Sequence, residues 1–93
     1  MTSRYELRLL PWSGPDGKPC FLSTDDSNSL VSCLADDMEE AQLFVAAELV
    51  AHALETLAGE EVQLERLRCL ATALTEALED ALRVAQSRGL RLP

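Results

Sequence analysis

The longest uninterrupted segment of this chain runs from Ser27 to Leu57 without a single Gly or Pro. Because Gly and Pro oppose helix formation more strongly than any other residues, this segment predicts one continuous helix over about residues 27–57. Gly59 lies just beyond it and is placed to end the helix. A helix of that length spans on the order of 45 Å, so the rest of the chain must supply surfaces for it to pack against.

A second helix is predicted over about residues 60–88, with Gly89 after its last turn. Arg83 and Arg88 fall near its carboxyl end, where cations interact favourably with the helix dipole. The linker between the helices, Ala-Gly-Glu-Glu, is short, and a short linker makes consecutive helices run antiparallel. The two segments therefore predict a long helical hairpin.

The amino-terminal part of the chain has the pattern of a β-hairpin over about residues 4–23. In Tyr-Glu-Leu-Arg-Leu-Leu, apolar and charged side chains alternate, as in a strand with one buried face. This alternation places Leu7 and Leu9 on the buried face and Arg8 on the opposite one. The first strand is expected at about residues 4–11.

Turn chemistry follows this first strand. Pro15 favours the second position of a turn, Asp16 the next, and Gly17 tolerates a positive φ. A short second strand is expected at about residues 19–23. Trp12 and Phe21 are the aromatic residues expected to hold the hairpin against the helices.

The length of the chain limits it to one domain, because a second core would have too little chain to bury. We therefore expect a single α+β domain over residues 1–93, in which the N-terminal β-hairpin packs on the long antiparallel two-helix hairpin.

The apolar residues of the two predicted helices exceed what a helical hairpin can cover. The first helix has one seam at spacings of three and four made of Leu30, Leu34, Met38, Ala41, Val45 and Leu49. Its second seam is made of Leu43, Ala47, Val50, Leu54 and Leu57. The other helix has a face of Leu67, Leu70, Leu74, Ala77, Ala81 and Val84, flanked by Leu64, Leu78 and Leu82. A hairpin uses about one seam per helix, so we expect a homodimer that forms a four-helix bundle.

The net charge of −8 is unevenly distributed. From Pro19 to Glu65 there are eleven Asp or Glu residues and no Lys or Arg. Such a field opposes binding to nucleic acid or to an anionic membrane and favours a basic protein partner. The candidate partner-binding residues, on an acidic face of the first helix, are Asp36, Asp37, Glu39, Glu40 and Glu48.

The cysteines and the absence of long apolar runs indicate the compartment. Cys20, Cys33 and Cys69 are odd in number and widely spaced, which argues against a disulfide framework or a zinc site. Cys33 and Cys69 fall in helical segments and are expected in the core. No apolar run has the length of a signal peptide or approaches the ~20 residues of a membrane span, so we expect a cytoplasmic protein.

One cluster has the residue types of a metal site. Glu48, His52 and Glu55 are spaced so that all three lie on one side of the first helix. Carboxylates and an imidazole in this arrangement are ligands for a divalent metal. A lone His beside acids is also typical of an exposed, ion-paired residue.

A second acidic set joins the two helices. Asp36 and Glu40 of the first helix, with Glu76 and Asp80 of the second, resemble the paired acidic motifs of the all-helical nucleoside triphosphate pyrophosphatases, which are small dimeric bundles. The resemblance implies that these four residues hold a divalent metal and a nucleotide's phosphates. No set of Lys or Arg residues for phosphate binding accompanies the motifs, and no resemblance covers enough of the chain to name a family.

Taken together, the patterns favour a small acidic, non-catalytic interaction or regulatory protein without a cofactor. The alternative is a metal-dependent nucleotide pyrophosphohydrolase that uses the second acidic set.

Overall fold

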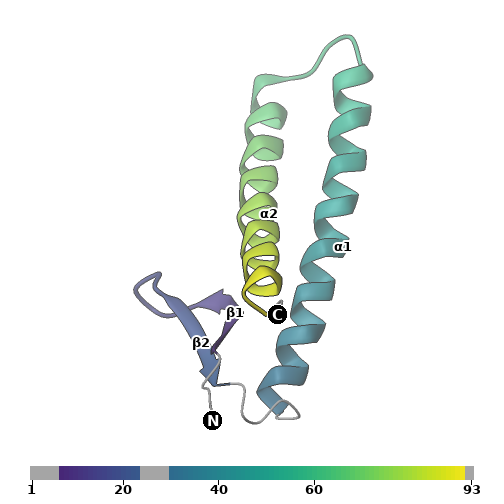
Figure 1. Cartoon of the computed structure of the whole chain (residues 1–93). Helices are drawn as coiled ribbons and strands as arrows, with labels where there is room; N and C mark the ends of the chain where they lie inside the picture. The colour runs from purple at the N-terminus through teal and green to yellow at the C-terminus, as the bar shows by residue number, and fades with distance from the viewer. Residues whose placement is uncertain (1–6, 24–29, 92–93) are drawn as a thin grey trace.

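The computed structural model describes residues 7–23 and 30–91 of the chain. In chain order its elements are strands β1 (Leu7–Ser13) and β2 (Pro19–Ser23) and helices α1 (Leu30–Ala58) and α2 (Leu64–Arg91). The predicted α+β class, with an N-terminal hairpin followed by two helices, is confirmed (Figure 1). Parts of the predicted hairpin and first helix, residues 4–6 and 27–29, lie outside the described residues.

The sequence predicts that the two helices end at Gly59 and Gly89, and the structure agrees with the first of these ends but not with the second. α1 ends at Ala58, and the Gly59 N–H donates a hydrogen bond to the Thr56 carbonyl at 3.2 Å. α2, by contrast, continues through Gly89 to Arg91, so the predicted stop at Gly89 is wrong. A glycine costs a helix only about 1 kcal/mol relative to Ala, which the last turn of a long helix can absorb.

The hairpin turn forms as its residues predict. The Gly17 N–H donates to the Gly14 carbonyl at 3.0 Å, which places Pro15 and Asp16 at the two central positions. Gly17 then takes a φ of 81°, a left-handed conformation that residues with a Cβ rarely adopt. β1 and β2 pair antiparallel, and their register shifts between Leu9 and Ser13.

The burial of β1 does not alternate as predicted. Leu7, expected inside, is 54% exposed, whereas Arg8, expected outside, is 3% exposed. Leu9, Leu10 and Pro11 are also buried. The reason is that β1 is covered from two directions, mainly by α2 and over a smaller area by α1, so it has no free face.

Arg8 is the residue that ties β1 to α1. Its Nη2 lies 2.6 Å from Asp36 Oδ1 and 3.3 Å from Glu39 Oε2. Its Nη1 donates to the Ser32 hydroxyl at 2.9 Å and to the Ser32 carbonyl at 3.2 Å. A buried guanidinium requires this kind of compensation, because its planar set of donors must replace lost water contacts.

The aromatic residues contribute less than predicted to this attachment. Trp12 is half-buried, but Phe21, expected to help hold the hairpin, is exposed. A second tie comes from Gln42 of α1, whose Nε2 donates to the Pro11 carbonyl at 2.9 Å.

The two helices meet mostly along small and polar side chains, with a few larger apolar ones among them. The α1 residues that are buried or half-buried at alternating spacings of four and three are Ala35, Glu39, Gln42, Ala46, Leu49, Ala53 and Thr56. The matching α2 residues are Leu70, Ala73, Ala77, Asp80, Val84 and Ser87. We call these two rows the contact seam. On α1 the contact seam lies between the two predicted apolar seams and shares only Leu49 with them, so α1 does not pack on α2 along either predicted seam.

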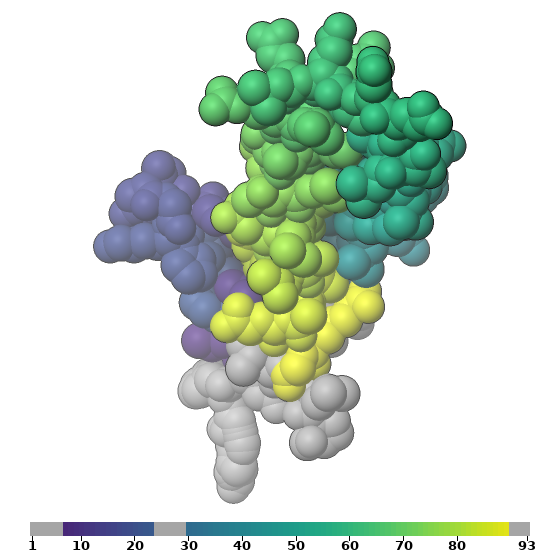
Figure 2. All heavy atoms as spheres, turned by 90° about the horizontal axis from the view of Figure 1, so that it is seen from above, coloured from purple at the N-terminus to yellow at the C-terminus, as the bar shows by residue number. Residues whose placement is uncertain are grey.

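β2 and the turn stand on the side of α2 that faces away from α1, near the end where α2 finishes (Figures 1 and 2), whereas β1 contacts α2 and reaches α1 through Arg8 and Pro11. The hairpin therefore leaves most of the length of α1 uncovered. Only Ser32, Ala35 and Glu39 of α1 are fully buried.

By length and composition, α1 is the one described helix that could cross a membrane. Its most apolar 18-residue window has a mean hydropathy of 1.3, and none of that window is buried within the chain. The expectation that no segment approaches membrane-spanning length does not hold for α1 on these two measures. Core helices of water-soluble proteins and leader segments meet the same criteria, and α1 also carries Glu48 and Glu55 in its second half.

Replacing Arg8 by Met should lower the free energy of unfolding by about 3–5 kcal/mol, because it leaves the buried Glu39 carboxylate without its cation. The double variant R8M/E39M should recover more than half of that loss, since an apolar pair replaces the ion pair. Urea unfolding followed by circular dichroism measures both values.

Lys18→Ala is the matched control, because Lys18 and Asp16 form an exposed pair at 3.7 Å. It should change stability by about 0.5 kcal/mol or less. A loss for R8M as small as the loss for K18A would show that the buried cluster does not hold the hairpin.

Candidate interaction surface

The edge of α1 opposite the contact seam carries an acidic stripe. In an α-helix successive residues are about 100° apart, so positions spaced by three, four and seven share an edge. We define the acidic stripe as Asp37, Glu40, Phe44, Glu48 and Glu55, all of them exposed. α1 contains no Lys or Arg, so no basic side chain of the same helix neutralises the stripe.

Phe44 is the apolar member of this stripe. Its side chain is 66% exposed and lies between the Asp37–Glu40 end and the Glu48–Glu55 end. Aromatic side chains supply a large contact area for few rotatable bonds, which is why they are frequent energetic anchors at protein interfaces. An exposed Phe bordered by carboxylates is suited to a partner that is both apolar and basic.

The acidic face predicted from the sequence divides into two groups in the structure. Asp37, Glu40 and Glu48 are exposed, as partner-binding residues must be. Asp36 and Glu39 bind Arg8 within the chain instead, and Glu39 is 2% exposed. These two acids stabilise the hairpin attachment.

Two members of the stripe were not assigned to it from the sequence. The sequence pattern places Glu55 with the candidate metal ligands and indicates no role for Phe44. The spacing of Glu40, Phe44 and Glu48 by four residues is the signal that identifies them, once the inner edge of α1 is known.

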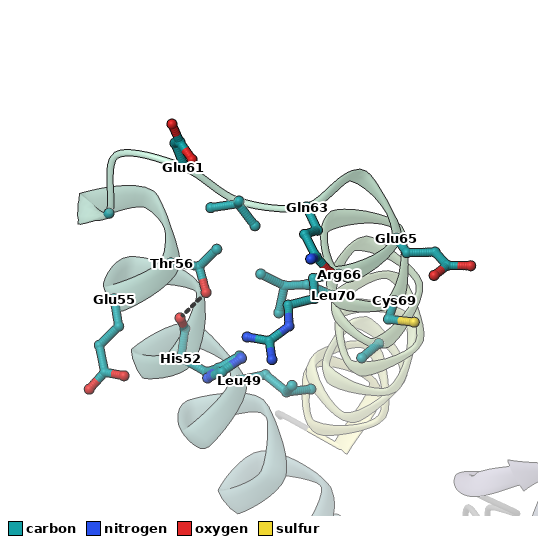
Figure 3. A pocket seen from close by; sticks show the side chains of 13 residues that line it. Leu49, His52, Glu55, Thr56, Glu61, Gln63, Glu65, Arg66, Cys69 and Leu70 are labelled. Carbon is teal, nitrogen blue, oxygen red and sulfur yellow. Dashed lines mark hydrogen bonds between the residues drawn. The ribbon is translucent and has the colours of Figure 1, made fainter.

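At the end of the helical pair far from the β-hairpin, the helices border an open cleft of about 930 Å³ (Figure 3). His52 of α1 and Arg66 of α2 point into the space between the helices, whereas Glu55 and Glu65 point outward (Figure 3). The Thr56 hydroxyl donates to the His52 carbonyl at 3.0 Å. The cleft marks one side of the helical pair, which we call the cleft side.

The structure does not assemble the candidate metal ligands. Within residues 7–23 and 30–91, no group of three or more His, Cys, Asp or Glu side chains is placed to hold a metal ion. Glu48, His52 and Glu55 therefore do not form a three-ligand set. In the other acidic set, Asp36 binds Arg8, and Asp80 accepts a hydrogen bond from Arg83 at 3.0 Å.

The cysteine thiols are all free, as the sequence pattern predicts. Cys20 is half-buried, but Cys33 and Cys69 are exposed, so the expectation that they belong to the core is wrong. Neither Cys33 nor Cys69 belongs to the contact seam.

Comparison with known proteins finds no matching family model, no matching curated protein and no matching solved structure.

Adding 5 mM MgCl2 or MnCl2 should leave the melting temperature of the protein within about 1 °C of its metal-free value. The physical reason is that only a ligand that prefers the folded state stabilises it, and the described residues present no three-ligand group. Differential scanning fluorimetry with 15 mM NaCl, which matches the ionic strength, is the measurement and its control. A rise of several degrees with Mn2+ but not with NaCl would restore the metal-dependent enzyme as a candidate.

Proposed function

We propose that this protein is a small acidic, non-catalytic interaction or regulatory module of the cytoplasm, and that it presents the acidic stripe of α1 to a basic protein partner. The observation that supports this most directly is the stripe itself, with four exposed carboxylates around an exposed Phe44. Free thiols at Cys20, Cys33 and Cys69 agree with a reducing compartment.

Electrostatics supports a protein partner over a polyanion. The chain carries a net charge of −8, and nucleic acids and anionic lipid surfaces require clustered Lys or Arg residues for binding. A basic protein gains from the long-range attraction to the stripe, which raises its association rate, while Phe44 supplies a contact that salt does not screen.

The paired acidic residues of the enzyme alternative support it less well. Asp36 and Asp80 are engaged with arginines of the same chain, so two of the four proposed metal ligands already have cationic partners.

Binding to a basic amphipathic helix should depend on the stripe. The probe is a fluorescent 20-residue peptide of Lys and Leu with the Leu residues on one helical face, measured by anisotropy in 150 mM NaCl. The variant E40K/E48K should weaken binding at least tenfold. It replaces two carboxylates beside Phe44 by lysines, whose positive charges repel the lysines of the peptide.

The matched control is E76K/E79K on α2, which changes the net charge from −8 to −4 just as E40K/E48K does. Glu76 and Glu79 are exposed but lie outside the stripe, so this variant should bind the peptide within threefold of the unchanged protein. Equal weakening by both variants would show that bulk charge, and not the stripe, attracts the peptide.

We also propose that two copies of the chain associate into a four-helix bundle. Large apolar side chains remain exposed along both helices, among them Leu34, Val45 and Leu54 of α1 and Leu67 and Leu78 of α2. A helix that is apolar on most sides is normally covered by further protein or by lipid. A chain of this size also buries too little surface alone to be more than marginally stable.

Light scattering coupled to size exclusion should give twice the 10.2 kDa mass of the chain, at both 50 mM and 1 M NaCl. High salt screens repulsion between the acidic copies and strengthens apolar contacts, so the dimer should persist or tighten at 1 M. A mass of one chain at 100 µM under both conditions would contradict self-association.

A further inference from the structure

The side of the helical pair opposite the cleft is defined by both helices. His52 of α1 and Cys69 of α2 line the cleft. At about 100° per residue, Val50 and Leu54 lie roughly 160–200° around α1 from His52, and Leu78 lies roughly 180° around α2 from Cys69. These three side chains therefore lie on the far side of the helical pair from the cleft.

We call this side the reverse face. Its large side chains are Leu43, Val50 and Leu54 of α1 and Leu67, Leu74 and Leu78 of α2. The positions between them on the same side are alanines, such as Ala47 and Ala71. Between residues 41–58 of α1 and residues 64–85 of α2, no charged side chain falls on this side.

We infer that the reverse face is the surface through which two copies of this chain pair. The inference rests on the proposed homodimer and assigns its interface. In a two-fold dimer the same patch occupies both sides of the interface, so a patch with a net negative charge would face another with the same net charge. For a chain of net charge −8, a patch without charge is where two copies approach with the least electrostatic opposition.

The absence of charge on the reverse face also argues against a basic partner on this side. A partner selected by charge gains nothing from a surface without Asp or Glu, and the acids that attract it are on the outer edge of α1. The two surfaces therefore fit two different occupants, which are a second copy for the reverse face and a basic protein for the acidic stripe.

The part of the reverse face that the β-hairpin leaves free is large enough for a specific interface. β1 contacts α1 at Ser32, Asp36 and Glu39, and Ser32 and Asp36 lie on the same side of α1 as Val50 and Leu54, so the free part begins at about residue 41. Residues 41–58 span about 27 Å, and two helices side by side are about 20 Å wide. The free part thus offers on the order of 500 Å² per copy, or about 1,000 Å² for the two copies together, which is the lower limit for a specific interface.

Repulsion between the acidic stripes selects how the copies are turned. If the two-fold axis is perpendicular to the helices, α1 packs on α1 of the second copy. The two α1 outer edges then lie on the same side of the bundle, and their carboxylates are neighbours. If the axis runs along the helices, α1 packs on α2 of the second copy and the stripes lie on opposite sides. The second arrangement leaves both stripes accessible, so one dimer presents two sites to a basic partner.

The test compares two substitutions of the same residue type on the same helix. Val50 on the reverse face is 53% exposed and Val45 on the cleft side is 52% exposed, so neither is needed to fold the single chain. Sedimentation of the full chain from 1 to 200 µM in 150 mM NaCl measures the dimer Kd of V50E and V45E. V50E should raise the Kd at least 100-fold, because it buries an unpaired charge at the interface, and V45E should change it less than threefold.

L78E on α2 is the second reverse-face variant and should act as V50E does, because Leu78 is also exposed in the single chain. Circular dichroism of each variant shows whether its helices remain formed. If V50E and L78E stay dimeric with intact helices, or if V45E dissociates as strongly, the assigned interface is wrong while the dimer stands.

Two other outcomes would show that the reverse face is not covered by a second copy of the chain. An unchanged protein that is monomeric over the whole range would overturn the homodimer itself and this interface with it. Co-flotation of the unchanged protein, but not of V50E, with phosphatidylcholine vesicles would identify a bilayer as what covers the reverse face, and would also overturn the inference.

Discussion

The contact seam between the helices determines most of what this molecule exposes. The seam contains alanines at 35, 46 and 53 of α1 and only three larger apolar residues, Leu49, Leu70 and Val84, so the helices are held together by little apolar area. The large residues are left on either side of the seam, where one chain alone has nothing to cover them. Burial of apolar surface is the main favourable term in folding, at about 25 cal/mol per Å². A fold that leaves this much of it in water gains stability from any association that covers it, which is why we propose a dimer.

The buried Arg8 cluster sets the second constraint, because it commits two of the acids of α1 to structure. Arg8 has to be compensated once β1 enters the space beside the helices, and Asp36 and Glu39 are the nearest carboxylates one turn apart. The remaining acids of α1 have no basic residue in their own helix and stay on the surface. The acidity of α1 therefore serves two separate ends, which are the attachment of the hairpin and the charge of the outer edge.

The three other sides of α1 consequently differ in chemistry. The outer edge is acidic with one exposed Phe44, the reverse face is uncharged over residues 41–58, and the cleft side mixes apolar residues with His52. We propose that the uncharged side pairs the copies and that the acidic side meets a basic protein. Segregating the two keeps like charges out of the self-association surface and leaves the attractive charges where a partner can reach them.

The sequence by itself determined the elements of this protein. Gly and Pro positions mark the end of α1 at Gly59 and the turn at Pro15–Gly17, although not the end of α2, because these signals depend only on residues close together in the chain. The tertiary structure alone decided which edge of α1 faces α2. α1 is apolar on most sides, so its periodicity has no single direction, and close packing of small side chains selects the edge. The burial of Arg8 also depends on the tertiary structure. Its partners Ser32, Asp36 and Glu39 lie more than twenty residues away in the sequence and contact it only when the chain is folded.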